Sequence, residues 1–546
     1  MFPLISLAVG LILFEGGLSL KLSELHETGT VVLRLVSLGL VASWLLAATA
    51  AWWILEFSLP MAVLLGALLT VSGPTVILPL LRHVRPAKRI SSVAKWEGIV
   101  NDPIGAVLAA LVFEVVAHGG LDSEHLASDS LLSLGRAVVV GVSLGVLGAW
   151  LLRYLLKHYW IPDYLQNPVF LAVILVLFAA SNLLQHESGL LTVTLLGVIL
   201  ANQRDVAVQH VVEFKENLRV LLISTLFIVL ASRVSISREM LVSVGLPTLA
   251  FVAVLIFAIR PIAAMLATFG SDLSWRERLL LCWIHPRGIV AAAVASLFAL
   301  HLGSTEFAQQ ADAFVFVTFA VIVGTVVVYG LTLGPLANWL GLSRSNPQGV
   351  LFAGASPWVR EVALALQEEG YSTLLIDTNP EKIAAARMAG LPVQLASITS
   401  ELVLDAMDLG EVGRLLAVTS NDEVNSLATM EFSDEFGRAG VHQLAPPETS
   451  SERYQQVPAH RRGRNLFDEI ATLVALERRH AAGDEVKRTA LTDDFTYDDF
   501  LQRYGETALL LFVIDDGGQL IVNSTDEDVS PEPGQKVIAL VRNVEA

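Results

Sequence analysis

The first 342 residues carry long apolar segments separated by short polar ones. A helix needs roughly 20 apolar residues to cross the hydrocarbon core of a bilayer. The pattern therefore predicts about eleven membrane spans, at residues 3–20, 30–55, 60–82, 92–116, 132–156, 168–185, 188–203, 216–231, 239–268, 275–300 and 312–341. We expect a polytopic α-helical membrane domain over residues 1–342.

Two of these segments contain helix breakers in their middle. The third carries Gly73 and Pro74, and the tenth carries Pro286 and Gly288. Proline removes a backbone donor and glycine permits unusual dihedral angles, so backbone groups freed there need protein, water or ions as partners. A single break can be a harmless kink, but two breaks seven spans apart are typical of inverted repeats with a binding site between them.

Polar residues also lie in the middle of the fourth segment, at Glu97, Asn101 and Asp102. A carboxylate at membrane depth costs on the order of 3 kcal/mol even on lenient insertion scales. Asp102 can bind either a proton or a hard cation, whereas Asn101 offers polar atoms that do not titrate. Removal from water disfavours the ionised carboxylate, so Asp102 is a candidate for coupling protons to cations.

Other charged residues within the spans need a partner or a route to water. Arg287, in the break of the tenth segment, is a permanent positive charge, and we expect Glu97 to form a structural ion pair with it. Arg260, toward the end of segment 239–268, is expected to extend to the membrane surface. Glu15, in the first segment, is a candidate for lining the site.

The loops between the segments indicate the orientation. Arg and Lys recur in alternate loops, for example at 82–89, 153–157, 204–215 and 276–278, and positive loops face the cytoplasm. This places the N-terminus outside and the C-terminal part inside. Because Met1 opens directly into an apolar span, either the first helix inserts in the less usual direction or the chain lacks upstream helices, and we favour the second alternative.

The net charge divides the chain in two. Residues 343–546 contain 17 Lys and Arg against 33 Asp and Glu, a net charge of −16, whereas the chain as a whole carries −17. An acidic, soluble tail therefore follows an almost neutral membrane part. This balance argues against nucleic acid and against anionic lipid as partners of the tail.

Four stretches carry a resemblance to a known family: Phe14 to Leu18, Ser72 to Val76, Glu97 to Pro103, and Pro286 to Gly288. Together they resemble the sodium/proton exchanger family, in the monovalent cation:proton antiporter-1 branch. The resemblance implies the inverted-repeat antiporter fold, a homodimer, and an elevator-like motion of a core bundle. In that family the first of these stretches usually lies in the third of thirteen helices, which fits a chain that lacks two.

The resemblance also implies roles for individual residues. Asp102 would bind the cation or the proton, Asn101 would mark the electroneutral branch, and Glu15 and Thr75 would line or border the ion path, with Glu97 paired to Arg287. Two departures concern the ligands: Gly73 stands where the family often has aspartate, and Gly98 where it often has serine. Both remove oxygen atoms, so the preference for Na⁺ or K⁺ stays open.

After residue 346 the pattern changes to alternating strands and helices. A short strand at 349–353 is followed by Gly354 and Ser356 at a turn, a helix at 358–369, and a second strand ending at Asp377. This layout is typical of a dinucleotide fold, in which Asp377 would contact a ribose hydroxyl. Only the first of the three usual glycines is present.

Residues 346–440 are similar to the regulatory nucleotide-binding domain of TrkA-type potassium-uptake proteins. That resemblance implies adenine nucleotide or NAD(H) as a regulatory ligand at Gly354, Ser356 and Asp377; a degenerate scaffold or a dimerisation module is the alternative. No cofactor is required for exchange itself. Residues 441–546 are expected to form a small α+β regulatory module, with strands at 509–514, 519–522 and 537–541, and 445–465 as a linker or lid.

A membrane domain joined to such a tail could have one of three functions. The first is an electroneutral antiporter in the plasma (inner) membrane that exchanges Na⁺ or K⁺ for H⁺ under control of a cytoplasmic tail. The second is a potassium channel or uptake system gated by that tail, but the sequence lacks a Thr-Val-Gly-Tyr-Gly filter. The third, an NAD-linked enzyme on a membrane anchor, would need an intact glycine loop and far fewer spans. The sequence favours the antiporter and no enzymatic activity.

Overall fold

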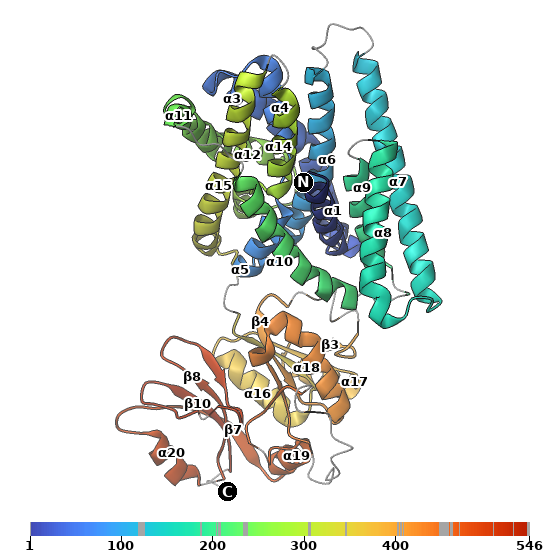
Figure 1. Cartoon of the computed structure of the whole chain (residues 1–546). Coiled ribbons are helices and arrows are strands. Elements are labelled where there is room, and N and C mark those ends of the chain that lie inside the picture. Colours follow the sequence, from blue (N-terminus) through green and yellow to red (C-terminus); the bar gives the residue numbers. More distant parts are fainter. Residues whose placement is uncertain are drawn as a thin grey trace. The chain divides into compact units, whose positions relative to one another are not determined.

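The computed structural model describes residues 2–117, 126–185, 188–203, 205, 209–232, 238–303, 307–343, 347–400, 403, 407, 409–446, 458, 462–468, 470–505, 507–527 and 529–542. The chain forms two compact units, Met1–Ser345 and Asn346–Ala546. The first is helical and the second combines helices with two sheets (Figure 1).

The helices of the first unit follow the apolar segments of the sequence. They are α1 (Phe2–Leu18), α2 (Leu25–Arg34), α3 (Leu40–Ile54), α4 (Leu59–Leu68), α5 (Pro74–Val84), α6 (Lys88–Ala117), α7 (Leu126–Lys157), α8 (Asp163–Leu184), α9 (Ser188–Ala201), α10 (Gln209–Ala231), α11 (Arg238–Val254), α12 (Arg260–Thr268), α13 (Trp275–Trp283), α14 (Ile289–Leu302) and α15 (Ala308–Trp339). A 3₁₀ turn, η1 (Leu22–Glu24), precedes α2.

Each of the eleven expected segments contains helix. Among the described residues, six helices are long and apolar enough to cross a membrane, and five shorter apolar helices of 10–17 residues accompany them. The first unit is therefore a helical membrane domain, as expected, and the count of eleven crossings stays a prediction.

The order of elements repeats within this unit. Helices α2 and α3 are joined by a π-helical turn, η2 (Leu35–Gly39), and are followed by the pair α4 and α5 and by the long α6. In the second half, α11 and α12 are joined by the π-helical turn η3 (Leu255–Ile259) and are followed by the pair α13 and α14 and by the long α15. The matching positions of the π turns and of the breaks support the expected internal repeat.

The two breaks lie where the sequence predicts them, and they touch each other. Helix α4 ends at Leu68 and α5 begins at Pro74, while α13 ends at Trp283 and α14 begins at Ile289. A Cβ atom added to Gly73 would lie 2.8 Å from the backbone N of Gly288, and one added to Gly288 would lie 2.6 Å from the Cα of Gly73. The two unwound segments therefore cross at a contact that only glycine permits on both sides.

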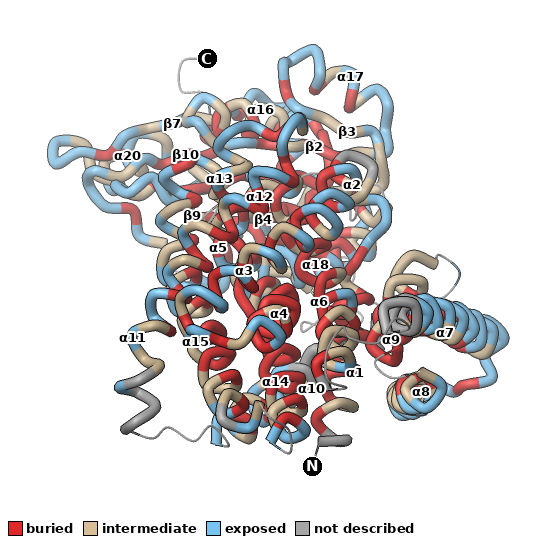
Figure 2. The backbone as a smooth tube through the Cα atoms, turned by 90° about the horizontal axis from the view of Figure 1, so that it is seen from above, coloured by how far each residue is buried: buried red, intermediate tan, exposed pale blue. Residues whose placement is uncertain are grey.

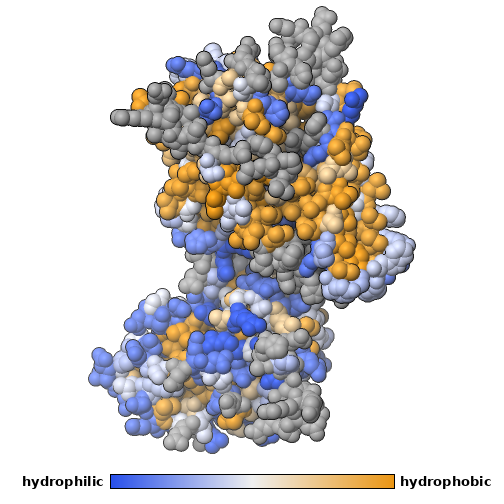
Figure 3. Space-filling model, in the orientation of Figure 1, coloured by the Kyte–Doolittle hydropathy of each residue, from blue (hydrophilic) through white to orange (hydrophobic). Residues whose placement is uncertain are grey.

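Burial separates the inside of this unit from its lipid-facing surface. Most residues of α4 and α14 are buried, whereas α7 is exposed along most of its length (Figure 2). Val139, Leu147 and Trp150 of α7 are among the exposed apolar side chains. The visible surface of the helical unit carries a broad apolar area that the second unit lacks (Figure 3), as expected for a surface that contacts lipid.

The second unit begins with a doubly wound parallel sheet. Its elements are β1 (Gly349–Ala353), α16 (Pro357–Glu368), β2 (Thr373–Asp377), α17 (Pro380–Met388), β3 (Val393–Leu395), β4 (Val412–Ala417), α18 (Asp422–Phe436), the 3₁₀ turn η5 (Arg438–Gly440), β5 (Val441–Gln443) and β6 (Arg464–Asn465). The strand order is β3-β2-β1-β4-β5-β6, which is that of a dinucleotide fold. Since β5 and β6 belong to this sheet, the expected boundary after residue 440 falls inside it.

A smaller antiparallel sheet completes the second unit. It is built from α19 (Leu473–Ala481), β7 (Asp484–Ala490), α20 (Tyr497–Tyr504), β8 (Leu509–Ile514), β9 (Leu520–Val522) and β10 (Lys536–Arg542), with strand order β7-β10-β8-β9. The three expected strands are confirmed, and the turn Asp515–Gly518 joins β8 to β9. Most of the expected linker or lid at 445–465 lies outside the described residues.

Candidate functional site

The helix α6 brings the carboxylates and the amide of the sequence motif into the middle of the helical unit. Asp102 is fully buried, and Glu97 and Asn101 are each 2% exposed. The Oγ of Ser72, in the first break, donates to the carbonyl of Gly98 at 2.7 Å and lies 3.5 Å from the Oδ1 of Asp102. The unwound segment between α4 and α5 is thus placed directly against Asp102.

Ser72 is a site residue that the sequence analysis missed. Its signal was its position: it is a hydroxyl between the apolar Val71 and the break at Gly73, in a segment whose backbone cannot be helical. Fully buried, it supplies the link between the break and α6.

Three side-chain oxygen atoms of α5 and α6 are buried without a hydrogen-bond partner among the described residues. They are the Oγ1 of Thr75, the Oδ1 of Asn101 and the Oδ2 of Asp102. Leaving a buried polar atom unpaired costs about 1–3 kcal/mol, so a group of such atoms needs an explanation. Carboxylate, amide and hydroxyl oxygens are ligands of hard cations, and a transported cation would supply the partner they lack.

The ion pair of Glu97 differs from the expected one. Glu97 accepts hydrogen bonds from the Nη1 and Nη2 of Arg260, at 2.5 and 2.9 Å, and both side chains are buried. The expected pairing of Glu97 with Arg287 was wrong, and so was the expectation that Arg260 reaches the membrane surface. The physical reason is that α12 packs against α2, α3 and α13, so its first residue lies inside the bundle although it is near the end of an apolar segment.

Arg287 instead contacts the backbone of the first break. Its Nη1 lies 3.3 Å from the carbonyl oxygen of Val71 and 3.5 Å from that of Thr70. Its backbone N–H donates to the Oγ1 of Thr325 on α15 at 3.2 Å. The side chain therefore crosses from the second break to the C-terminal end of α4.

Arg260 contacts the backbone carbonyls of the second break, at the end of α13, as Arg287 does for the first. Its Nη2 donates to the carbonyl oxygens of Leu281 and Ile284, at 2.7 and 3.2 Å, at the C-terminal end of α13. The last carbonyls of a helix have no partner within it and carry partial negative charge. In each interrupted helix, the carbonyls left without a helical partner thus contact one buried arginine.

Glu15 lies on a helix that packs along α6. It is 7% exposed on α1, next to Gly16, whose added Cβ would lie 3.6 Å from the Cγ2 of Ile99 on α6. A Cβ on Gly17 would lie 2.3 Å from the carbonyl oxygen of Thr194, so this glycine lets α9 approach α1 closely. The expected role of Glu15 in lining the ion path stays a prediction.

In the second unit, the glycine turn is held by the acidic residue expected to contact a ribose. The Oδ2 of Asp377 accepts the backbone N–H of Ala355 at 2.9 Å, and its Oδ1 accepts that of Asn379 at 2.8 Å. Ser356, in place of the second glycine, is 2% exposed, and its Oγ has no partner among the described residues. Gly354 has φ +125°, which suits glycine alone. These residues fit a dinucleotide poorly, because both carboxylate oxygens are engaged and a side chain occupies the place where a pyrophosphate would approach.

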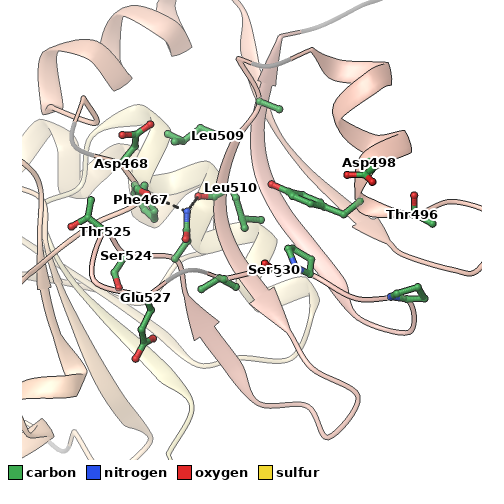
Figure 4. Close-up of a pocket in the computed structure, with 16 residues that line it drawn as sticks. Phe467, Asp468, Thr496, Asp498, Leu509, Leu510, Ser524, Thr525, Glu527 and Ser530 are labelled. Atoms are coloured by element: carbon green, nitrogen blue, oxygen red, sulfur yellow. Dashed lines mark hydrogen bonds between the residues drawn. The ribbon is translucent and has the colours of Figure 1, made fainter.

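The second unit also contains a polar cavity of about 810 Å³, lined by Phe467, Asp468 and residues of the antiparallel part between 496 and 533 (Figure 4). The side chain of Asn523 lines this cavity and donates hydrogen bonds to the carbonyls of Phe467 and Leu510. Its lining includes the carboxylates of Asp468, Asp498 and Glu527, and no Lys or Arg among the residues described there. This charge does not favour an anionic nucleotide in the cavity.

A helical membrane unit with two crossed, interrupted helices and a buried carboxylate beside the crossing defines a secondary transporter. The family model for the transmembrane sodium/hydrogen exchangers matches residues 4–339, and the chain belongs to that family. A second family model, for the TrkA-N domain, matches residues 350–460. The family is one of transporters, and both resemblances expected from the sequence are confirmed.

Several curated proteins resemble this chain. It is 26% identical to a K⁺/H⁺ antiporter, NhaP, of Alkalimonas amylolytica, over 89% of this chain and 85% of the relative. It is 25% identical to Na⁺/H⁺ antiporter 1 of Methanocaldococcus jannaschii, over 61% of this chain and 80% of the relative. A solved structure of the sodium proton antiporter MjNhaP1 from that organism at pH 8 matches with a TM-score of 0.53 and 23% identity, over 61% of this chain and 84% of that one. This last likeness supports the antiporter fold.

Proposed function

We propose that this protein exchanges a monovalent cation, Na⁺ or K⁺, for H⁺ across a membrane, with one exchange site at Asp102. The observation that carries the proposal is the buried Asp102 carboxylate, with its Oδ2 unpartnered among the described residues, beside the crossing of two interrupted helices. The unpartnered oxygens of Asn101 and Thr75 would add cation ligands. Antiporter names among the relatives support exchange rather than a gated channel.

The charges around the site support electroneutral exchange. Glu97 is neutralised by Arg260, and Asn101 carries no charge, which leaves Asp102 as the carboxylate that binds cargo. A proton and a monovalent cation each add one positive charge to Asp102. Because the two ions exclude each other on one carboxylate, the loaded site carries the same charge in both directions of the cycle. Glu97 would then be structural and not an ion ligand.

The sequence and the family suggest where the protein lies, how it assembles and what its tail does. The proposed location is the plasma (inner) membrane, with the basic loops and the TrkA-N tail in the cytoplasm. The proposed assembly is a homodimer in which a core bundle moves, and the proposed role of the tail is regulation. The crossing of the two unwound segments, whose glycines touch, supports their movement as one body.

The test is cation-dependent proton flux by the purified full chain in liposomes, measured with a pH-sensitive dye for Na⁺, K⁺ and Li⁺. Asp102→Asn should abolish the flux, because the amide can neither release a proton nor neutralise a cation. Asp312→Asn, on the exposed side of α15, is the matched control and should behave like the parent. Full activity of Asp102→Asn would refute the proposal.

A further inference from the structure

His285, in the second break, makes a contact that the exchange scheme does not use. Its side chain is 4% exposed, and its Nε2 lies 2.8 Å from the Nη1 of Arg287. A guanidinium group can only donate hydrogen bonds, so the Nε2 of His285 accepts and the proton of the neutral ring sits on Nδ1. That Nδ1 lies 3.8 Å from the Oε1 of Glu97.

This contact is the shortest that anchors the guanidinium of Arg287. The two carbonyl contacts of the same Nη1, to Val71 and Thr70, are longer at 3.3 and 3.5 Å. The Nε of Arg287 has no hydrogen-bond partner among the described residues. Without His285, the hydrogen bonds of the side chain to described residues would be reduced to these two weaker contacts.

A loosened Arg287 would have a competing partner nearby. Arg287 contacts the carbonyl of Val71, and the Oγ of the next residue, Ser72, lies 3.5 Å from the Oδ1 of Asp102. The Oδ2 of Asp102 is an unpartnered carboxylate oxygen within the described part of the unit. Arginine forms strong charge-assisted hydrogen bonds with carboxylates, above all where water is absent. A guanidinium bound to Asp102 would occupy the place of the transported cation.

We propose that His285 is a positioning residue that holds Arg287 on the carbonyl end of α4 and thereby keeps Asp102 open to the transported cation. This inference rests on the proposed exchange activity. In this inference His285 does not contact either transported ion. Its Nε2 holds Arg287 away from Asp102 and so sets the affinity of the site for the cation.

The test compares four variants of the full chain in liposomes, with flux measured against cation concentration at one pH. His285→Gln can place an amide oxygen where Nε2 lies, whereas His285→Asn carries the same group one methylene too short. His285→Ala and His285→Phe remove the acceptor with and without loss of volume. We expect the Asn, Ala and Phe variants to raise the KM for the cation at least fivefold, with Vmax per folded protein within about twofold of the parent, and the Gln variant to match the parent in KM.

Two outcomes would overturn the inference. One is an unchanged KM in the Asn, Ala and Phe variants, with a lower Vmax or less folded protein, which would indicate packing alone. The other is a Gln variant as impaired in KM as the Asn variant. Absence of flux in the parent protein would instead refute the proposed function, so the two failures can be told apart.

Discussion

The carboxylate of Glu97 on α6 receives both terminal nitrogens of Arg260 on α12, at 2.5 and 2.9 Å, in the interior of the membrane unit. The pair joins α6, the last helix of the first repeat, to α12, which follows the π-helical turn of the second repeat. The same guanidinium also holds the carbonyls that end α13. Arg260 is therefore the residue at which both repeats and one of the two breaks meet.

Replacement of Arg260 by alanine should reduce the amount of folded protein severely. It leaves the Glu97 carboxylate buried and unpaired, and breaking a buried pair in this way costs about 3–5 kcal/mol. Thermal unfolding of the detergent-purified chain checks this, with the exposed Arg136→Ala as control. The double variant Glu97→Gln with Arg260→Gln should recover part of the loss, because it removes the stranded charge. Normal yield and melting temperature of Arg260→Ala would contradict the pairing.

The substitution Asn101→Asp should make exchange sensitive to voltage. Asn101 is a neutral neighbour of Asp102, and its Oδ1 is unpartnered among the described residues. A second carboxylate would add a charge that the cargo does not neutralise, and each charge moved across the membrane is worth about 2.3 kcal/mol per 100 mV. Flux in liposomes whose potential is clamped with K⁺ and valinomycin would then change with the potential for the variant only. Equal rates at all potentials would count against the charge balance proposed above.

Alanine at Gly73 or at Gly288 should destabilise the crossing of the two breaks. The added Cβ would lie 2.8 Å or less from backbone atoms of the opposite segment, where no side chain can move aside. Forced overpacking of this kind typically costs about 1–3 kcal/mol. Gly334→Ala on α15, with no atom within 4 Å of the added Cβ, is the control. If both crossing variants melt at the temperature of the parent, the close contact is not present in the folded protein.

Acid should destabilise the second unit through His442. Burial, aided by the positive charges of Arg464 and Arg414, lowers the pKa of this histidine to about 3. Because the unfolded chain has an ordinary histidine pKa of about 6.5, it takes up a proton below that pH while the folded unit does not. Stability is therefore complete above pH 6.5 and falls as the pH drops from 6.5 toward 3.

The measurement for His442 is hydrogen exchange of the β5 amides, Val441–Gln443, in the full chain at pH values from 7 to 5, corrected for intrinsic exchange. Protection should fall with acidification in the parent, and it should fall less in His442→Gln, which does not titrate in this range. Equal slopes for the two proteins would show that other groups account for the acid sensitivity.

Local patterns account for much of what was predicted correctly. Hydropathy located the apolar helices, because a span must satisfy its backbone internally and therefore reads as a continuous apolar run. Gly73 with Pro74, and Pro286 with Gly288, marked both breaks, since glycine and proline close together weaken a helix at that point. The sequence indicated Asp102 because a carboxylate at that depth in a membrane costs free energy and is therefore usually functional.

The partner of Glu97 could not be obtained in this way. Arg260 and Arg287 both lie in the second repeat, and their positions along the chain do not tell which one faces α6. Position within an apolar segment placed Arg260 near the membrane surface, but this residue begins α12 inside the bundle and is 4% exposed. The role of Ser72 depended likewise on which helix the break would touch.

The order of residues along the chain determined which segments are apolar helices, where two of them are interrupted and which carboxylate is the candidate for binding an ion. Each of these follows from solvation and backbone geometry over a few neighbouring residues. Only the tertiary structure decided which charges neutralise one another, which arginine holds the carbonyls of which break, and that Asp377 is engaged by its own loop. Those choices depend on distances between segments far apart in sequence, and such distances arise only when the helices pack.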